Sequence, residues 1–200
     1  MRPATHQVRL AAVLDYAQTG DAMFFDGSSG WFSRIIRWTT GSPTHVGIVV
    51  RRDGEPVSIV ESTTLLERDG GERIRGVQRS ELQWRVEKYE GRVWLACLKA
   101  SARQRLNENE LMRYLEIVEG GRYDMRQAIW SGVGQWVRFI PGTSRPDALF
   151  CSELYRNALV EAGLSVGVLG KDETPTPNQL SKLPIFDRIY QCKGKPREIG

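Results

Sequence analysis

The residues that could carry out nucleophilic catalysis are few, because the sequence has only two histidines and three cysteines. His6 lies in an N-terminal segment with no other reactive residue near it. His45 instead follows the turn sequence Ser42-Pro43-Thr44 and begins an apolar run typical of a strand, which would hold its ring near the rim of a sheet. Considered alone, such a histidine is more often structural. It becomes the candidate base if a nucleophile lies nearby.

Cys151 differs from the other two cysteines in its position relative to a predicted helix. It directly precedes the pattern SELYRNALVEAG (152–163), whose apolar residues recur at helical spacing up to a terminal glycine. The unpaired N–H groups and the dipole at the start of a helix favour a thiolate. Cys97 lies in an apolar run and is most simply a small buried residue, and Cys192 has no evident partner. The sequence lacks a CxxC and any Cys/His pair at metal-ligand spacing, so we expect neither a disulfide framework nor a metal site.

A cysteine and a histidine form a thiol nucleophile and its base, and a third group usually orients the imidazole. Glu61, on the next predicted strand, is the candidate for this third group. A two-residue loop at Asp53-Gly54 would place His45 and Glu61 on opposite faces of the sheet. A three-residue loop would instead place Glu61 opposite Gly47, diagonal to His45 on the same face and roughly 7 Å away between Cβ atoms. The assignment therefore requires the odd-numbered loop. Without Cys151 and His45, a surface carboxylate would be the simpler interpretation of Glu61.

The elements that must position these residues follow from periodicity and turn signals. Alternating or continuous apolar runs predict strands, and apolar residues three or four apart between capping signals predict helices. The polar, glycine-containing stretch 67–76 is typical of a loop. The predicted strands are 22–25, 44–50, 57–62 and 92–100, and the predicted helices are 31–41, a segment capped by Asn107, a weaker one after Asp124, and the one after Cys151.

Composition limits the classes of protein to which the chain can belong. It has 200 residues, of which 40% are hydrophobic and 26% charged, enough for one domain with a core (1–200) and unlike a disordered chain or a coiled coil. The longest apolar runs are a few residues, so we expect no membrane-spanning helix. The N-terminal segment does not resemble a secretory signal, which leads us to expect a cytoplasmic protein.

The charge balance gives only weak information about partners. A net charge of +4 allows attraction to an anionic polymer. The basic residues are dispersed, and the densest clusters, at 73–79 and 193–197, carry no interleaved aromatic residues of the kind that stack on bases. We therefore expect no nucleic-acid partner and interpret both clusters as solvated loops.

Several blocks of the sequence together resemble a known superfamily. In their order they are similar to circularly permuted NlpC-type papain-like proteins, most of all the YiiX-like group, and more distantly to lecithin retinol acyltransferases. In that superfamily the histidine precedes the cysteine, as it does here. The blocks span about residues 20 to 190 and are GDAMFF (20–25), WFSRIIRWTTGSPTHVGIVV (31–50), IVEST (59–63), GRYD (121–124), FCSELYRNALVEAGL (150–164) and the late TPNQLSKLPIF.

The resemblance implies an α+β fold of the permuted papain-like type, in which a small antiparallel sheet packs against helices. It also implies that Cys151 is the nucleophile, His45 the base and Glu61 the polar third member, with no metal or organic cofactor. The backbone N–H of Cys151, at the predicted helix start, would then be an oxyanion donor. Trp31, Tyr123 and Trp136 are candidates to line a substrate cleft, although aromatic residues at helical spacing more often belong to a core.

Three functions are compatible with these residues. The first, which we favour, is a cysteine hydrolase that cleaves an amide, such as the peptide of a bacterial cell-wall polymer, through an acyl-enzyme on Cys151. The second uses the same acyl-enzyme on a lipid ester or thioester, as an acyl hydrolase or acyltransferase. The third is a non-catalytic binding module for an anionic polymer. The retention of all three candidate catalytic residues favours an enzyme.

Overall fold

The fold is built on a mixed seven-stranded sheet with the strand order β1-β7-β6-β2-β3-β4-β5. The structure is a computed structural model that describes residues 5–27, 42–67, 73–119, 146–164 and 175–195. The edge strand β1 pairs in parallel with β7, and the other neighbouring strands pair antiparallel. The strands are β1 (Thr5–Gln7), β2 (Ala22–Asp26), β3 (His45–Val50), β4 (Ser58–Glu67), β5 (Arg73–Glu81), β6 (Arg92–Leu98) and β7 (Phe186–Lys193).

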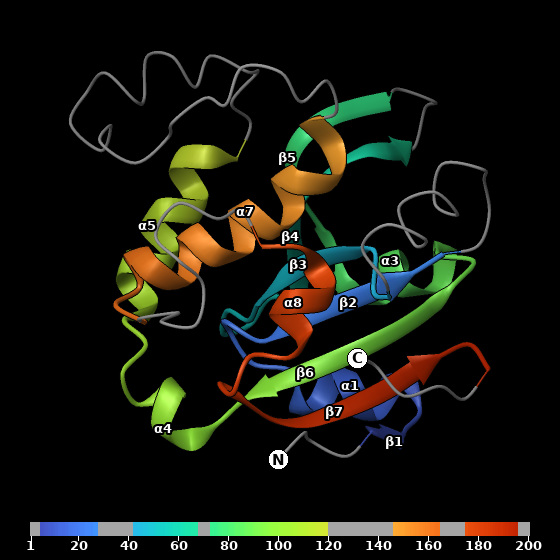
Figure 1. Cartoon of the computed structure of the whole chain (residues 1–200), viewed down its shortest axis with the longest axis horizontal. Coiled ribbons are helices and arrows are strands. Elements are labelled where there is room, and N and C mark those ends of the chain that lie inside the picture. The colour runs from blue at the N-terminus through green and yellow to red at the C-terminus, as the bar shows by residue number, and fades with distance from the viewer. Residues whose placement is uncertain (1–4, 28–41, 68–72, 120–145, 165–174, 196–200) are drawn as a thin grey trace.

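Helices cover both faces of this sheet, which makes the chain an α+β protein (Figure 1). A larger core joins α4, α5, α7 and α8 to one face, around the buried rings of Phe24, Trp94 and Tyr155. A smaller core joins α1 and α3 to the other face. The helices are α1 (Leu10–Tyr16), α3 (Leu82–Lys88), α4 (Ala100–Arg103), α5 (Glu108–Val118), α7 (Pro146–Glu161) and α8 (Pro177–Ser181).

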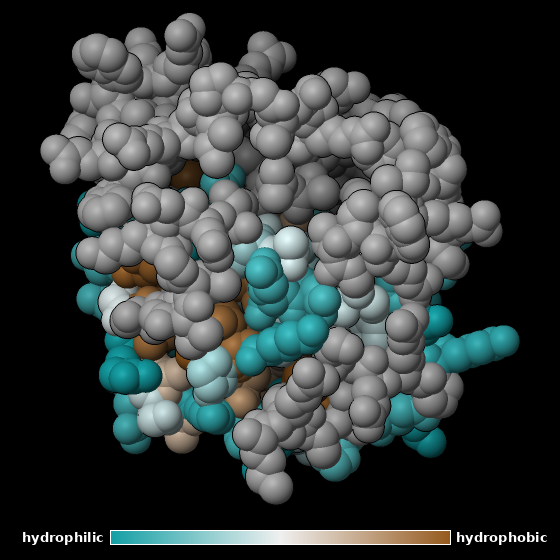
Figure 2. All heavy atoms as spheres, viewed as in Figure 1, coloured by the Kyte–Doolittle hydropathy of each residue, from teal (hydrophilic) through white to brown (hydrophobic). Residues whose placement is uncertain are grey.

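The surface over the larger core is partly apolar. Figure 2 shows hydrophobic side chains at the surface in the area of α5 and α7. Ile117 of α5 and Val160 of α7 are among the large hydrophobic residues that remain exposed. Single exposed residues of this kind are common on globular proteins, and they identify no partner.

The register between β3 and β4 is the one that the odd-numbered loop requires. Ile48 pairs with Val60 and Val49 with Ile59, so the ladder places Gly47 opposite Glu61. A Cβ atom at Gly47 would lie 2.5 Å from Ile59 Cδ1 and 3.2 Å from Glu61 Cβ. Glycine at position 47 therefore leaves the room that the Glu61 and Ile59 side chains occupy.

Two sequence predictions about the sheet are wrong. The stretch 67–76, predicted as a loop, contains the start of β5, and the basic cluster 73–79 lies within that strand and not in a solvated loop. The sheet is also neither small nor wholly antiparallel, because β5 and β7 extend it and β1 joins in parallel. Pairing with β4 satisfies the backbone of β5, so this strand forms even though its apolar residues alternate only weakly. That weak alternation did not predict a strand.

The other predicted elements agree with the structure where it describes them. The strands predicted at 22–25, 44–50, 57–62 and 92–100 are observed as β2, β3, β4 and β6. The helices predicted at 31–41 and after Asp124 lie outside the described residues.

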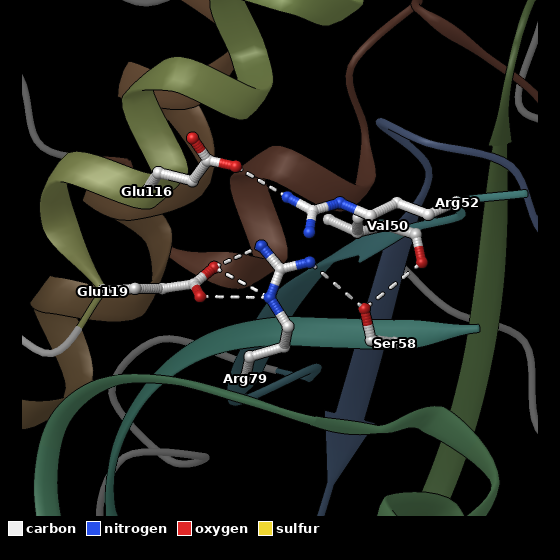
Figure 3. Close-up of polar contacts among 6 residues, drawn as sticks. All are labelled: Val50, Arg52, Ser58, Arg79, Glu116 and Glu119. Carbon is white, nitrogen blue, oxygen red and sulfur yellow. Dashed lines mark hydrogen bonds and ion pairs between the residues drawn. The ribbon is translucent and has the colours of Figure 1, made fainter. Parts of the chain in front are cut away.

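Polar contacts attach α5 to β5 at the edge of the sheet, to β4 beside it and to the turn between β3 and β4 (Figure 3). The guanidinium of Arg79, on β5, contacts both carboxylate oxygens of Glu119, with Nη2 at 2.6 Å from Oε1. It also donates to Ser58 Oγ on β4 at 3.4 Å. Beside this pair, Arg52 Nη2 donates to Glu116 Oε1 at 2.7 Å. These contacts fix the helix that packs alongside α7.

Asp21, directly before β2, connects the start of that strand to the end of β6 and to α4. Its buried carboxylate accepts hydrogen bonds from the backbone N–H of Gln18 at 2.9 Å and of Leu98 at 2.8 Å, and it pairs with Arg103 of α4. Burial raises the pKa of Asp21 to about 6, although the charge of Arg103 opposes this shift. The hydroxyl of Tyr155, on α7, donates to the neighbouring carbonyl of Gly20 at 3.0 Å. The Gly20-Asp21 turn thus positions α7 relative to the sheet.

The N-terminal cap of α5 provides a test of the fold. Asn107 Oδ1 accepts the backbone N–H of Glu110 at 3.3 Å, as its sequence position predicts. Because this bond satisfies a donor that the helix leaves open, Asn107→Ala should lower the free energy of unfolding by about 1 kcal/mol. Urea denaturation measures the change. Asn107→Asp, which retains an acceptor, should stay near the parent, and equal stability of all three chains would contradict the assignment.

Candidate active site

His45 and Glu61 form a direct contact across neighbouring strands. His45 is the first residue of β3, and its Nε2 lies 2.5 Å from Glu61 Oε2 on β4. The Glu61 side chain has no exposed surface, whereas 18% of the His45 side chain is exposed. The ring of Phe25, on β2, lies beside the imidazole with 5.6 Å between centroids. The predicted base and its predicted partner are therefore brought together, at the partly open end of a strand.

Arg85 of α3 completes the surroundings of Glu61, and the sequence analysis missed it. Its Nε contacts Glu61 Oε1, and its Nη2 donates to Oε2 at 3.1 Å. Its guanidinium also lies over the rings of Phe25, at 4.7 Å, and Tyr89, at 5.2 Å. Burial alone would raise the pKa of Glu61, but the charge of Arg85, with smaller contributions from His45, lowers it to about 2. Glu61 is therefore a carboxylate throughout the physiological pH range.

A sequence signal for Arg85 does exist. In LQWRVEKY (82–89) the arginine occupies the helical face shared by the apolar residues Leu82, Val86 and Tyr89. A charged residue on the apolar face of a helix is expected to have a buried partner. The pattern indicates that Arg85 is paired, but it does not identify Glu61 as the partner.

Cys151 is buried in the larger core and forms a side-chain hydrogen bond with His45. Since His45 Nε2 already contacts Glu61, Nδ1 is the ring nitrogen available to the thiol. Burial is the largest influence on His45 and lowers its pKa. The charge of Cys151, the bond to it and the contacts with Glu61 together outweigh burial and raise the pKa of His45 to about 9. The imidazole thus connects α7, through Cys151, with α3, through Glu61 and Arg85.

The predicted position of Cys151 at the mouth of its helix is wrong. α7 begins at Pro146, so Cys151 is its sixth residue. Proline is favoured in the first turn of a helix, which accounts for the earlier start. Only the first four N–H groups of a helix lack partners within it, so the Cys151 amide is not an oxyanion donor at this position. The helix dipole also acts mainly within the first turn, so it contributes little at the position of Cys151.

The remaining cysteines have no comparable surroundings. Cys97, on β6, and Cys192, on β7, are half-buried free thiols. Burial raises the pKa of each of them to about 12. Both are therefore protonated at neutral pH. The predicted cleft residues Trp31, Tyr123 and Trp136 lie outside the described residues.

Gln78 of β5 is a second polar residue beside the site that the sequence analysis missed. It pairs with Glu61 in the β4–β5 ladder and is 6% exposed. Within the described part of the chain, its Nε2 has no hydrogen-bond partner. A buried donor of this kind is a group that the oxygen of a bound ligand could satisfy.

The described residues do not form a metal site. Across these ranges, no three His, Cys, Asp or Glu side chains are grouped so that they could hold a metal ion. Both oxygens of Glu61 contact Arg85, and one also contacts His45. None of the helices within the described ranges is sufficiently long and apolar to cross a membrane.

Comparisons with known proteins establish a likeness of fold. No family model matches the chain, and no curated protein matches it. Among solved structures, the chain is similar to the crystal structure of the metalloprotein yiiX from Escherichia coli O157:H7, with a TM-score of 0.52 and 17% sequence identity. The match covers 90% of this chain and 99% of that one. The chain therefore has a yiiX-like fold, and at this identity the likeness concerns the fold alone.

The contact between Cys151 and His45 can be tested without a substrate. The charge of Cys151 and its hydrogen bond raise the pKa of His45, so Cys151→Ser should lower the pKa of His45 below about 9. Nuclear magnetic resonance titration of 15N-labelled histidine side chains measures this value. His6, on the edge strand β1, provides a second resonance that the substitution should not affect. An unchanged His45 titration would show that the two side chains do not interact.

Proposed function

We propose that the chain is a thiol hydrolase with a circularly permuted NlpC-type papain-like fold, and that it cleaves an amide through an acyl-enzyme on Cys151. The observation that supports this proposal is the contact series Cys151–His45–Glu61. It contains a nucleophile, a base and a group that orients the base, in the order that nucleophilic catalysis requires. The sequence blocks around the three residues, which resemble the papain-like superfamily, support the same class.

Acylation would begin from a thiolate on Cys151 and an imidazolium on His45. The sulfur attacks the carbonyl carbon of the substrate, and a C–S bond forms. As the tetrahedral intermediate collapses, the C–N bond breaks and His45 Nδ1 donates its proton to the leaving amine. Glu61 accepts the hydrogen bond from Nε2–H throughout, so it holds the ring in the orientation that directs Nδ1 to the reacting atoms.

Deacylation would use the same groups with water as the nucleophile. Neutral His45 removes a proton from water, and the oxygen forms a bond to the acyl carbon. The C–S bond then breaks and releases a carboxylic acid, the thiolate and the imidazolium. The 18% exposure of the His45 side chain gives water access to this end of the site.

A metal does not fit this set of side chains, even though the similar yiiX structure is described as a metalloprotein. The carboxylate of Glu61 contacts Arg85 through both oxygens, and the guanidinium beside it would repel a cation. Cys151 and His45 contact each other, which leaves the described site without a third ligand. The proposed steps therefore use the side chains alone.

The proposed reaction is tested by product release from amide and thioester probes. We expect the parent to release the amine from peptide amides of the cell-wall type, and Cys151→Ala to abolish the release. His45→Ala should slow it by about 10²–10⁴-fold, because the general acid and base is lost. Acid quenching followed by mass spectrometry should locate the acyl group on Cys151.

The controls separate this reaction from its alternatives. Cys97→Ser and Cys192→Ser should leave the release unchanged, because burial keeps both thiols protonated. Cleavage of thioesters with no cleavage of amides would replace the amide proposal by an acyl-lipid hydrolase or acyltransferase. Release that persists in Cys151→Ala would exclude Cys151 as the nucleophile.

A further inference from the structure

Four side chains form a continuous series of contacts through the site. Arg85 contacts Glu61, Glu61 contacts His45, and His45 contacts Cys151. Arg85, Glu61 and Cys151 are each less than one-tenth exposed. The His45 side chain is the more exposed member of the series. When Cys151 is a thiolate and His45 an imidazolium, the charges along the series alternate and their sum is zero.

The position of Arg85 is fixed by contacts with two strands and by the attachment of its own helix to a third. Its guanidinium binds the carboxylate on β4 and lies over the Phe25 ring of β2. Its own helix, α3, is held at the C-terminal end by Lys193 of β7, whose Nζ donates to the carbonyls of Val86 and Glu87 at 2.8 Å and 2.7 Å. Arginine presents its N–H groups in a planar fork, so two contacts with one carboxylate also fix the orientation of that carboxylate.

We propose that Arg85 is a positioning residue that acts through Glu61: it orients the Glu61 carboxylate toward His45 and balances its charge, so that the Cys151 thiolate forms within an electrically neutral set of side chains. This inference rests on the proposed pairing of Cys151 with His45. It goes beyond the proposed mechanism, which does not use Arg85.

Removal of Arg85 would change the balance of charges along the series. Glu61 would still carry a negative charge beside His45, and formation of the thiolate would then place two negative charges around one imidazolium. Like charges at such distances in a buried site disfavour ionisation. The thiolate would therefore form at higher pH.

Other groups around the series do not replace Arg85. Tyr89, directly after α3, and Phe25 of β2 face the guanidinium with their rings, and Gln78 of β5, opposite Glu61, is neutral. Lys193 of β7 donates to backbone carbonyls of α3. Of the side chains that the structure describes, the charged ones that contact Glu61 are Arg85 and His45.

The test is the pH dependence of iodoacetamide alkylation of Cys151, in chains that carry Cys97→Ser and Cys192→Ser. Arg85→Met should move the midpoint of the alkylation profile upward by about one pH unit, which is about a tenfold loss of rate at a fixed pH below the midpoint. Arg85→Lys retains the charge and should restore most of the rate. Glu61→Gln combined with Arg85→Met removes both charges and should return the midpoint toward that of the parent.

Arg79→Met is the matched control. Arg79 also contacts both oxygens of a carboxylate, that of Glu119, but it lies on the α5 side of the sheet. Its removal should lower stability without moving the alkylation midpoint. If Arg85→Met does not fold, the alkylation midpoints of Arg85→Lys and of the Glu61→Gln, Arg85→Met double variant are compared with that of Glu61→Gln instead.

The outcomes separate this inference from the proposed function. If the alkylation midpoint of the parent is lower than that of His45→Ala but is the same in Arg85→Met, the role of Arg85 is overturned and the proposed function stays intact. An equal shift in Arg79→Met and Arg85→Met would also overturn it, since the effect would then be structural. A parent thiol that shows no dependence on His45 would overturn both.

Discussion

The site depends on the buried contact between Arg85 and Glu61. A carboxylate without exposed surface is costly to bury unless a cation and hydrogen bonds compensate it, and the guanidinium provides both. Once Glu61 is held ionised, its second partner, His45, has a fixed position and a raised pKa. Glycine at position 47 leaves the space in which this carboxylate lies. The position of His45 is thus set by residues of β3, β4 and α3 together.

Cys151 reaches the same point from the other face of the sheet. Cys151 belongs to the core beneath α7, whereas Glu61 and Arg85 are associated with α3. His45 can join them because it is the first residue of β3, at the end of the strand. The buried hydroxyl of Tyr155 anchors α7 to the Gly20-Asp21 turn, and Asp21 in turn connects that turn to β6 and α4. The placement of Cys151 relative to His45 therefore depends on contacts far from either residue.

Local signals predicted part of this arrangement from the sequence. Asn107 and the turn at Gly54 mark element boundaries. Because side chains alternate between the faces of a strand, the register between β3 and β4 decides whether His45 and Glu61 share a face. The strand β5 could not be predicted in the same way, because its stability comes from pairing with β4. The Pro146 start of α7 placed Cys151 deeper in its helix than the apolar pattern indicated. Arg85 was visible as a charge on an apolar face, but only the tertiary structure identifies its partner.

The central claim is that Cys151 reacts as a thiolate because His45 is protonated beside it. The most direct measurement is the rate of Cys151 alkylation against pH in the parent and in His45→Ala, with Cys97 and Cys192 replaced by serine. The account predicts fast alkylation well below pH ~8.5, the region in which an ordinary thiol ionises, and loss of this reactivity in His45→Ala. Identical profiles for the two chains, both with the midpoint of an ordinary thiol, would contradict it and leave a non-catalytic binding module as the better interpretation.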